Sequence, residues 1–179
     1  KGRTKKDKQK MKTLLVFSLY LFFNCSLLWS SCWKDDEHSG ERQLFFKTFF
    51  DSPKKDVFFW LVDPSKIKRW LGPFSNHKLS KDPKTPFNVG HVRRISAPLL
   101  GFKVVDEEVT KYNPHSHIQY KASPSPFMKN HLGDMCLKTV SQSRTMLEWR
   151  ISFNSSFLTT KFIQLYIRFS LWRLHQSLP

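Results

Sequence analysis

TTKFIQLYIRFSLWRLHQSL, the stretch from Thr159 to Leu178, predicts one long helix near the end of the chain. It holds no Gly or Pro in twenty residues, so nothing in it interrupts a helix. At about 100° per residue, its polar side chains fall on one narrow stripe, which comprises Lys161, Gln164, Arg168 and His175. Apolar side chains fill both flanks of the stripe: Phe162, Leu165, Tyr166, Phe169 and Trp172 on one, and Ile163, Ile167, Leu171 and Leu174 on the other. A helix this apolar needs cover over most of its surface.

The segment between residues 41 and 154 indicates what covers the helix, because most of it has the pattern of strands and turns. A curved antiparallel sheet wrapped around the helix is the economical cover, and it predicts the fold class α+β. The alternative is a terminal helix that lies on a membrane through its basic stripe.

The charge of the chain favours anionic partners. Its net charge is +16, and residues 1–12 hold seven Lys or Arg and one Asp, so the remaining chain still carries +10. Such a balance suits phospholipid head groups or nucleic acid. The sequence shows no nucleic-acid motif with interleaved aromatic residues, so nucleic acid is not an expected partner. An anionic membrane surface is the expected anionic partner.

Residues 1–33 predict an N-terminal signal or membrane-anchor segment. A basic start is followed by residues 13–29, a run of seventeen residues that are uncharged and mostly Leu, Phe and Val. We therefore expect a protein that is membrane-anchored or exported through this segment, with a cytoplasmic protein as the alternative. Residues 34–40 form a polar linker, and residues 41–179 form the folded domain.

Two short helices and seven strands are predicted ahead of the last helix. The strands are 41–50, 74–79, 89–96, 101–112, 117–122, 132–140 and 146–154, and the short helices are 54–62 and 65–71. Ser52 is expected to cap the first of these helices, with Pro53 at its first position. In the last strand, alternation places Leu147, Trp149, Ile151 and Phe153 on one face. We expect this face to pack on Phe162, Leu165, Tyr166 and Phe169 of the long helix.

This order of elements, with short matches along the chain, resembles the polyketide cyclase/dehydrase and lipid-transport family of the START-like (SRPBCC) superfamily. The matching residues are Val57, Phe58, Leu61, Val62, Asp63 and Trp70, then Gly90-x-x-Arg93, Gly101 and Glu107-Glu108-Val109, then Pro114, Tyr120, Thr145 and Trp149. The resemblance covers about residues 41–178 and implies the helix-grip (START/Bet v 1-like) fold, a curved antiparallel sheet around a long C-terminal helix. Two features depart from the family: the N-terminal apolar segment, and the apolar outer flank of the last helix.

The resemblance also implies a hollow between the sheet and the long helix that receives a hydrophobic small molecule or lipid. Some members of the family cyclise or dehydrate polyketides in this hollow, and others only bind or carry a ligand. Fold alone does not choose between them. We expect binding or transport, with two alternatives: a cyclase or dehydratase that uses Glu107, Arg93 and Tyr120, and a membrane-surface protein without a ligand.

Glu107 is the charge of greatest interest in the sheet. Alternation places it on one face with Val105 and Val109, which predicts that it points into the apolar interior and needs a cationic partner. Arg93, on a neighbouring strand, is the available cation. Lys103 and Lys111 share the same parity, so the alternative is that this face is solvated and Glu107 lies on the surface.

The predicted ligand-binding residues are those that this hollow would bring together: Phe58, Leu61, Trp70, Arg93, Glu107, Tyr120, Trp149, Phe162, Tyr166 and Phe169. No catalytic residue is assigned, because only one charge is placed in the interior with enough support. His115 and His117 lack a third ligand at metal-binding spacing, so neither a metal nor a cofactor is expected.

Overall fold

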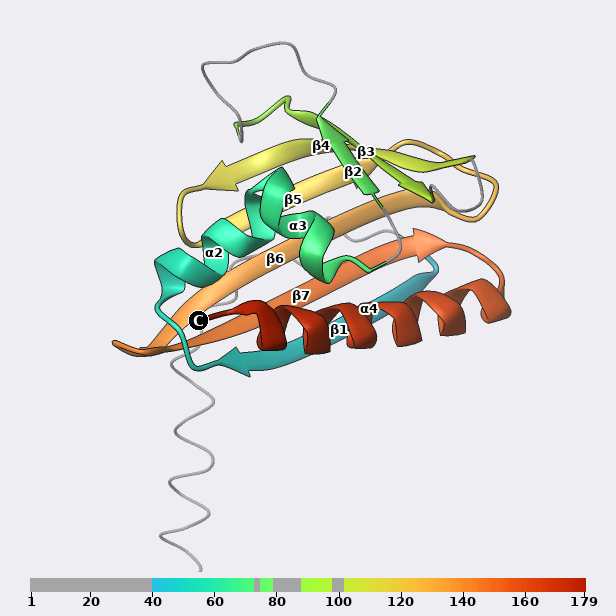
Figure 1. Ribbon diagram of the computed structural model, residues 1–179. Helices are drawn as coiled ribbons and strands as arrows, with labels where there is room; N and C mark the ends of the chain where they lie inside the picture. The colour runs from blue at the N-terminus through green and yellow to red at the C-terminus, as the bar shows by residue number, and fades with distance from the viewer. Residues whose placement is uncertain (1–39, 73–74, 79–87, 98–101) are drawn as a thin grey trace, which may run out of the picture. The chain divides into compact units, whose positions relative to one another are not determined.

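One curved antiparallel sheet and three helices make up the part of the chain that the computed structural model describes, residues 40–72, 75–78, 88–97 and 102–179 (Figure 1). The strands are β1 (Arg42–Phe50), β2 (Ser75–Lys78), β3 (Val92–Ala97), β4 (Phe102–Asn113), β5 (His117–Ala122), β6 (Lys129–Ser141) and β7 (Arg144–Asn154), in the spatial order β1-β7-β6-β5-β4-β3-β2. The helices are α2 (Lys54–Val62), α3 (Pro64–Trp70) and α4 (Phe157–Ser177). This is the predicted α+β helix-grip arrangement.

Most predicted elements agree with the structure to within a few residues. The bounds of α2 and β5 are as predicted. The predicted N-terminal segment (1–33), most of the linker, Gly101 and the predicted turn at residues 81–86 lie outside the described residues. Among the described helices, none is long and apolar enough to cross a membrane.

The start of α2 differs from the prediction. Its N-cap is Pro53, and no side chain caps it. Ser52 instead donates a hydrogen bond from Oγ to the carbonyl oxygen of Pro179, at 3.1 Å, while its own carbonyl accepts one from the Thr145 hydroxyl. The side chain that was expected to cap a helix therefore joins the end of β1 to the last residue of the chain.

The inward face of β7 is the centre of the core, as predicted. Leu147, Trp149, Ile151 and Phe153 are all at most 3% exposed. The register of the sheet places Met135 of β6 opposite Trp149. The opposite face of β7 is largely buried too, since Met146, Glu148 and Ser152 are at most 6% exposed.

Helix α4 turns the other of its two apolar flanks to the sheet. Ile167, Leu171 and Leu174 are buried in the core, and Ser170 between them is fully buried. The small side chain of Ser170 lets the helix lie closer to the sheet than a row of Phe and Trp would. The Ser156 side chain caps the helix by accepting a hydrogen bond from the backbone N–H of Thr159.

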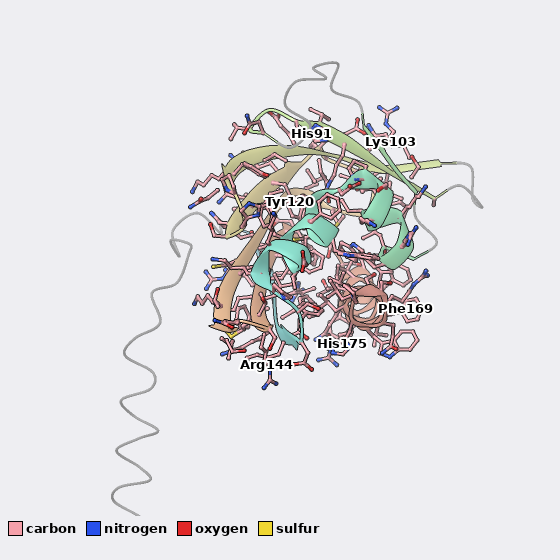
Figure 2. All side chains as sticks on the ribbon, turned by 60° about the vertical axis from the view of Figure 1, so that its left-hand side comes forward. His91, Lys103, Tyr120, Arg144, Phe169 and His175 are labelled. Atoms are coloured by element: carbon pink, nitrogen blue, oxygen red, sulfur yellow. The ribbon has the colours of Figure 1, made fainter. Side chains whose placement is uncertain are left out.

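The predicted packing of Phe162, Leu165 and Phe169 on β7 is therefore wrong. These three side chains are 62%, 66% and 48% exposed, and of the predicted set only Tyr166 packs against the core. Figure 2 shows Phe169 on the side of α4 that is turned away from the sheet, and Tyr120 between the sheet and the helices. Periodicity located the apolar flanks but did not determine which of them is covered.

Helices α2 and α3 cover the part of the sheet that α4 leaves open. Helix α2 contacts β6 and β7, and α3 contacts both α4 and β2 (Figure 1). Trp70, at the end of α3, is 2% exposed and donates a hydrogen bond from its indole nitrogen to the carbonyl oxygen of Trp60, at 2.8 Å. This bond satisfies the polar atom of a large side chain that would otherwise be costly to bury.

Candidate functional site

A cavity of about 120 Å³ lies between the inward face of the sheet and helices α3 and α4. Seven of the ten residues predicted to bind ligand line it: Trp70, Arg93, Glu107, Tyr120, Trp149, Phe162 and Tyr166. They come from α3, from four strands and from α4, so residues far apart in sequence meet at one place. Most of the lining is apolar, with polar groups on β3 to β6 at one side.

Three predicted residues lie elsewhere. Phe58 and Leu61 are buried at 2% and 1% exposure, but in the core beneath α2, where the Phe58 ring contacts Tyr112 and His115. Phe169 lies on the exposed flank of α4. The helical spacing that identified these side chains as apolar gave no information on how far each is from the sheet.

Other residues line the cavity but were not predicted from the sequence. They include Ile67, Leu71, Ile95, Met128, His131, Met135, Ile163 and Ile167. The signal that would have found Ile95 and Met135 is strand register, because they pair with Val105 and Trp149. That register depends on bulges that alternation alone does not reveal.

Arg93 and Glu107 form a buried ion pair at the edge of the cavity. They face each other directly across the β3–β4 pairing, and Arg93 Nε lies 2.7 Å from Glu107 Oε2. Their side chains are only 11% and 9% exposed. The inward orientation predicted for Glu107 is confirmed, and Arg93 is its partner. Each charge makes the burial of the other tolerable.

Two irregularities in β4 explain why Lys103 and Lys111 share parity with Glu107 without entering the cavity. Opposite β3, Ile95 pairs with Val105 but the next residue pairs with Lys103, which leaves Val104 as an extra residue. Opposite β5, Val109 pairs with Tyr120 but Lys111 pairs with Gln119, which leaves Thr110 as an extra residue. Each extra residue reverses the alternation, so the odd-numbered side chains face inward only within residues 105–109, whereas beyond the bulges Val104 and Tyr112 face inward instead.

Tyr120 connects the ion pair to the core. The Arg93 guanidinium lies 5.2 Å from the centre of its ring, and its hydroxyl accepts a hydrogen bond from Trp149 Nε1, at 3.1 Å. Gly133, which faces Tyr120 across the β5–β6 pairing, makes room for the ring, because a Cβ at this position would overlap it. Burial, followed by the nearby Glu107 carboxylate, raises the pKa of Tyr120 well above its usual value. Its hydroxyl therefore stays protonated at any physiological pH.

His131 is a cavity residue for which the sequence gave no signal. It is 8% exposed and lies at the start of β6, where the pairing with β7 is irregular between Lys129 and Leu132. Its ring stands edge-on to Tyr120 and Phe153, and no hydrogen bond reaches its Nδ1 atom. Burial lowers the pKa of His131, so its imidazole is neutral near pH 7.

Tyr166 fixes α4 against α3 beside the cavity. Its hydroxyl donates a hydrogen bond to the carbonyl oxygen of Leu71, just past the end of α3. Burial raises the pKa of Tyr166 as well. Within the described part of the chain, no three His, Cys, Asp or Glu side chains gather as a metal site would require.

Solved structures share this architecture. A protein from Chromobacterium violaceum aligns with a TM-score of 0.62 at 17% identity, over 76% of this chain and 96% of that one. The Aha1 dimer from Colwellia psychrerythraea gives a TM-score of 0.61 at 15% identity, over 76% and 96%. Ara h 8.0201 gives a TM-score of 0.60 at 10% identity, over 75% and 95%.

At these identities the comparisons show the fold alone, which is a Bet v 1-like helix-grip fold. No protein-family model matches the sequence, and no curated protein matches it.

Proposed function

We propose that this chain binds a hydrophobic small molecule, or one end of a lipid, in the cavity between the sheet and α4, and carries it without chemical change. The observation that supports this proposal is an apolar cavity with one polar side, where Arg93 and Glu107 lie. Ligand pockets commonly combine an apolar lining with a few polar groups that fix orientation. A dry apolar cavity of about 150 Å³ binds benzene, so this one suits about one ring or a short branched chain.

Native mass spectrometry of the purified full-length chain tests the proposal, together with analysis of an organic extract. We expect a releasable apolar molecule, and saturable quenching of tryptophan fluorescence when it is added back, because Trp70 and Trp149 line the cavity. Ile163→Trp should fill the cavity and abolish binding. Phe169→Trp, on the exposed flank of the same helix, is the matched control and should bind normally. Equal binding by both variants would contradict a ligand in this cavity.

The polar groups support binding rather than the cyclase or dehydratase alternative. Acid–base catalysis near neutral pH needs a group that gains and loses a proton there. Tyr120 stays protonated, and the Glu107 carboxylate already accepts a hydrogen bond from Arg93 Nε. A carrier in which Glu107→Gln changes ligand preference agrees with the proposal. If the chain converts a bound ligand to a product and Glu107→Gln stops that conversion, the cyclase or dehydratase alternative is favoured.

The exposed flank of α4 supports a second proposal, docking on an anionic membrane surface. Its side chains form one continuous apolar row: Leu158, Phe162, Leu165, Phe169 and Trp172, each at least 48% exposed. Lys161 and Arg168 border this row on one side and Arg173 on the other, and α4 contains no Asp or Glu. Apolar side chains flanked by cations are typical of helices that lie in an anionic bilayer interface.

Phe162 connects the two proposals. It belongs to the exposed row, and it also lines the cavity. The cavity therefore reaches the surface beside the flank that would meet the membrane, which is the geometry that a carrier of apolar molecules needs. Residues 1–33 fit the same setting as a signal or anchor segment, and cell fractionation of the chain with and without them tests that localisation.

Flotation with phosphatidylcholine vesicles, with and without phosphatidylglycerol, tests the docking. We expect binding only to the anionic vesicles, with loss of binding in high salt. Phe169→Ser should weaken it about tenfold or more, because an apolar side chain leaves the bilayer. Phe49→Ser, at a comparably exposed Phe on β1, is the matched control and should leave vesicle binding unchanged. A concentration-dependent dimer that Phe169→Ser abolishes, without vesicle binding, would assign the flank to a second copy and overturn the proposal.

A further inference from the structure

His131 lines the cavity, and its buried Nδ1 atom lacks a hydrogen-bond partner. A buried polar atom without a partner loses its hydrogen bonds to water and gains none in return, so native proteins keep few such atoms. The rings of Tyr120 and Phe153 stand 5.7 and 6.2 Å from the imidazole, each roughly perpendicular to it. They hold the imidazole in place, so it cannot easily turn towards another protein group. The missing partner is therefore expected to come from the contents of the cavity.

The charge of the cavity limits what that partner is. Arg93 and Glu107 are the only charged side chains among the described residues that line it, and they neutralise each other at 2.7 Å. The His131 imidazole is also neutral. A carboxylate or phosphate placed here would add an unbalanced charge to an apolar cavity, which is costly. An uncharged group has no such cost.

We infer that the ligand is an uncharged, oxygen-bearing apolar molecule, whose hydroxyl or carbonyl oxygen forms a hydrogen bond with Nδ1 of His131. This inference rests on the proposed ligand-binding function and specifies its ligand class. A neutral imidazole offers one donor and one acceptor nitrogen. If Nδ1 carries no proton it accepts from a hydroxyl, and if it is protonated it donates to a carbonyl. The cavity volume of about 120 Å³ suits a single ring beside that oxygen.

Calorimetric titration of the full-length chain with four compounds of one size tests the inference. Toluene carries no oxygen, p-cresol carries a hydroxyl, acetophenone carries a carbonyl, and 4-methylbenzoate carries a charge. We expect p-cresol or acetophenone to bind at least tenfold more tightly than toluene, and 4-methylbenzoate to bind most weakly. In His131→Phe, which keeps a ring between Tyr120 and Phe153, that tenfold advantage should disappear while toluene still binds. His175→Phe, at an exposed histidine of α4, should keep it.

Nitrogen NMR of the unsubstituted chain provides a second measurement that does not depend on how a variant folds. The Nδ1 resonance of His131 should move when the preferred oxygen compound is added and should not move with toluene. Toluene binding with no preference for oxygen, or a preference that persists in His131→Phe, overturns the inference and leaves the proposed function standing. Tightest binding of 4-methylbenzoate also overturns it. If none of the four compounds binds, the inference and the proposed function both fail.

Discussion

The ion pair between Arg93 and Glu107 predicts a stability pattern that a surface pair would not produce. We consider three variants: Arg93→Met, Glu107→Gln, and the two together. Each single change leaves one charge buried beside the cavity without its partner, and the double change removes both charges. The pair therefore predicts that the double variant is more stable than either single variant.

The geometry sets the size of this effect. At an effective dielectric of about 20, two charges 2.7 Å apart attract by about 6 kcal/mol, and desolvation of each ion offsets much of this. Loss of one partner from a buried pair typically costs about 3–5 kcal/mol, because the other charge remains buried. Apolar or neutral replacement of both partners is often close to neutral, so we expect a cost of about 1 kcal/mol for the double variant.

Urea unfolding followed by circular dichroism measures all three free energies, provided that the dependence on urea is the same in each variant. The coupling energy, which is the difference between the double variant and the sum of the two singles, should exceed about 2 kcal/mol. Additive costs, with a coupling energy below about 0.5 kcal/mol, would mean that the two charges are solvated. That result would refute the placement of Glu107 in the interior.

Of four further predictions, one concerns the core, one the N-terminus and two the dependence of stability on pH. Trp149→Ala should lower the free energy of unfolding by about 3–5 kcal/mol, as measured by urea unfolding, and a loss below about 1 kcal/mol would contradict its place in the core. A chain that lacks residues 1–40 should remain soluble and unfold cooperatively in calorimetry, and failure to fold would show that these residues are structural. Because burial lowers the pKa of His131 from 6.5, the unfolded chain binds a proton that the folded chain does not, so stability should fall as pH drops below about 6.5. His131→Phe should reduce that loss between pH 7 and 5, and an unchanged pH dependence would contradict the burial of His131. Asp106, whose pKa the hydrogen bond from Arg94 lowers to about 2, should stabilise the protein above pH 3.8 and lose this effect as pH falls towards 2, which Asp106→Asn tests in the same assay.

The fold could be predicted from the sequence because each strand has a local sequence pattern that identifies it. Alternation in β7 and β5 depends only on neighbouring residues, and the turns between strands are marked by Pro, Gly and Asn. The long helix is equally clear, since twenty residues without Gly or Pro have few other outcomes. These local signals, taken in order, are enough to predict an antiparallel sheet with a terminal helix.

Local sequence patterns could not predict which flank of α4 packs on the sheet. Both flanks are apolar, so the usual argument that the apolar side faces the core has two answers. The choice depends on the fit between the helix and the sheet, in which Ser170 and Leu174 are fully buried. The flank that carries Phe162 and Phe169 was assigned to the core because it is apolar, yet these two side chains are exposed.

The cavity depends on the places where the alternation of β4 fails. The extra residues Val104 and Thr110 reverse the pleat on either side of residues 105–109, so that Glu107 faces inward while the lysines beyond each bulge do not. A strictly regular strand would bring either the three charges of Lys103, Glu107 and Lys111 or the two of Asp106 and Glu108 to the interior. Local sequence rules are expected to fail at functional sites, because such sites need side chains that a regular element would not place together. The two bulges thus give a physical reason why the described residues that line this cavity include a single, neutralised ion pair and otherwise uncharged side chains.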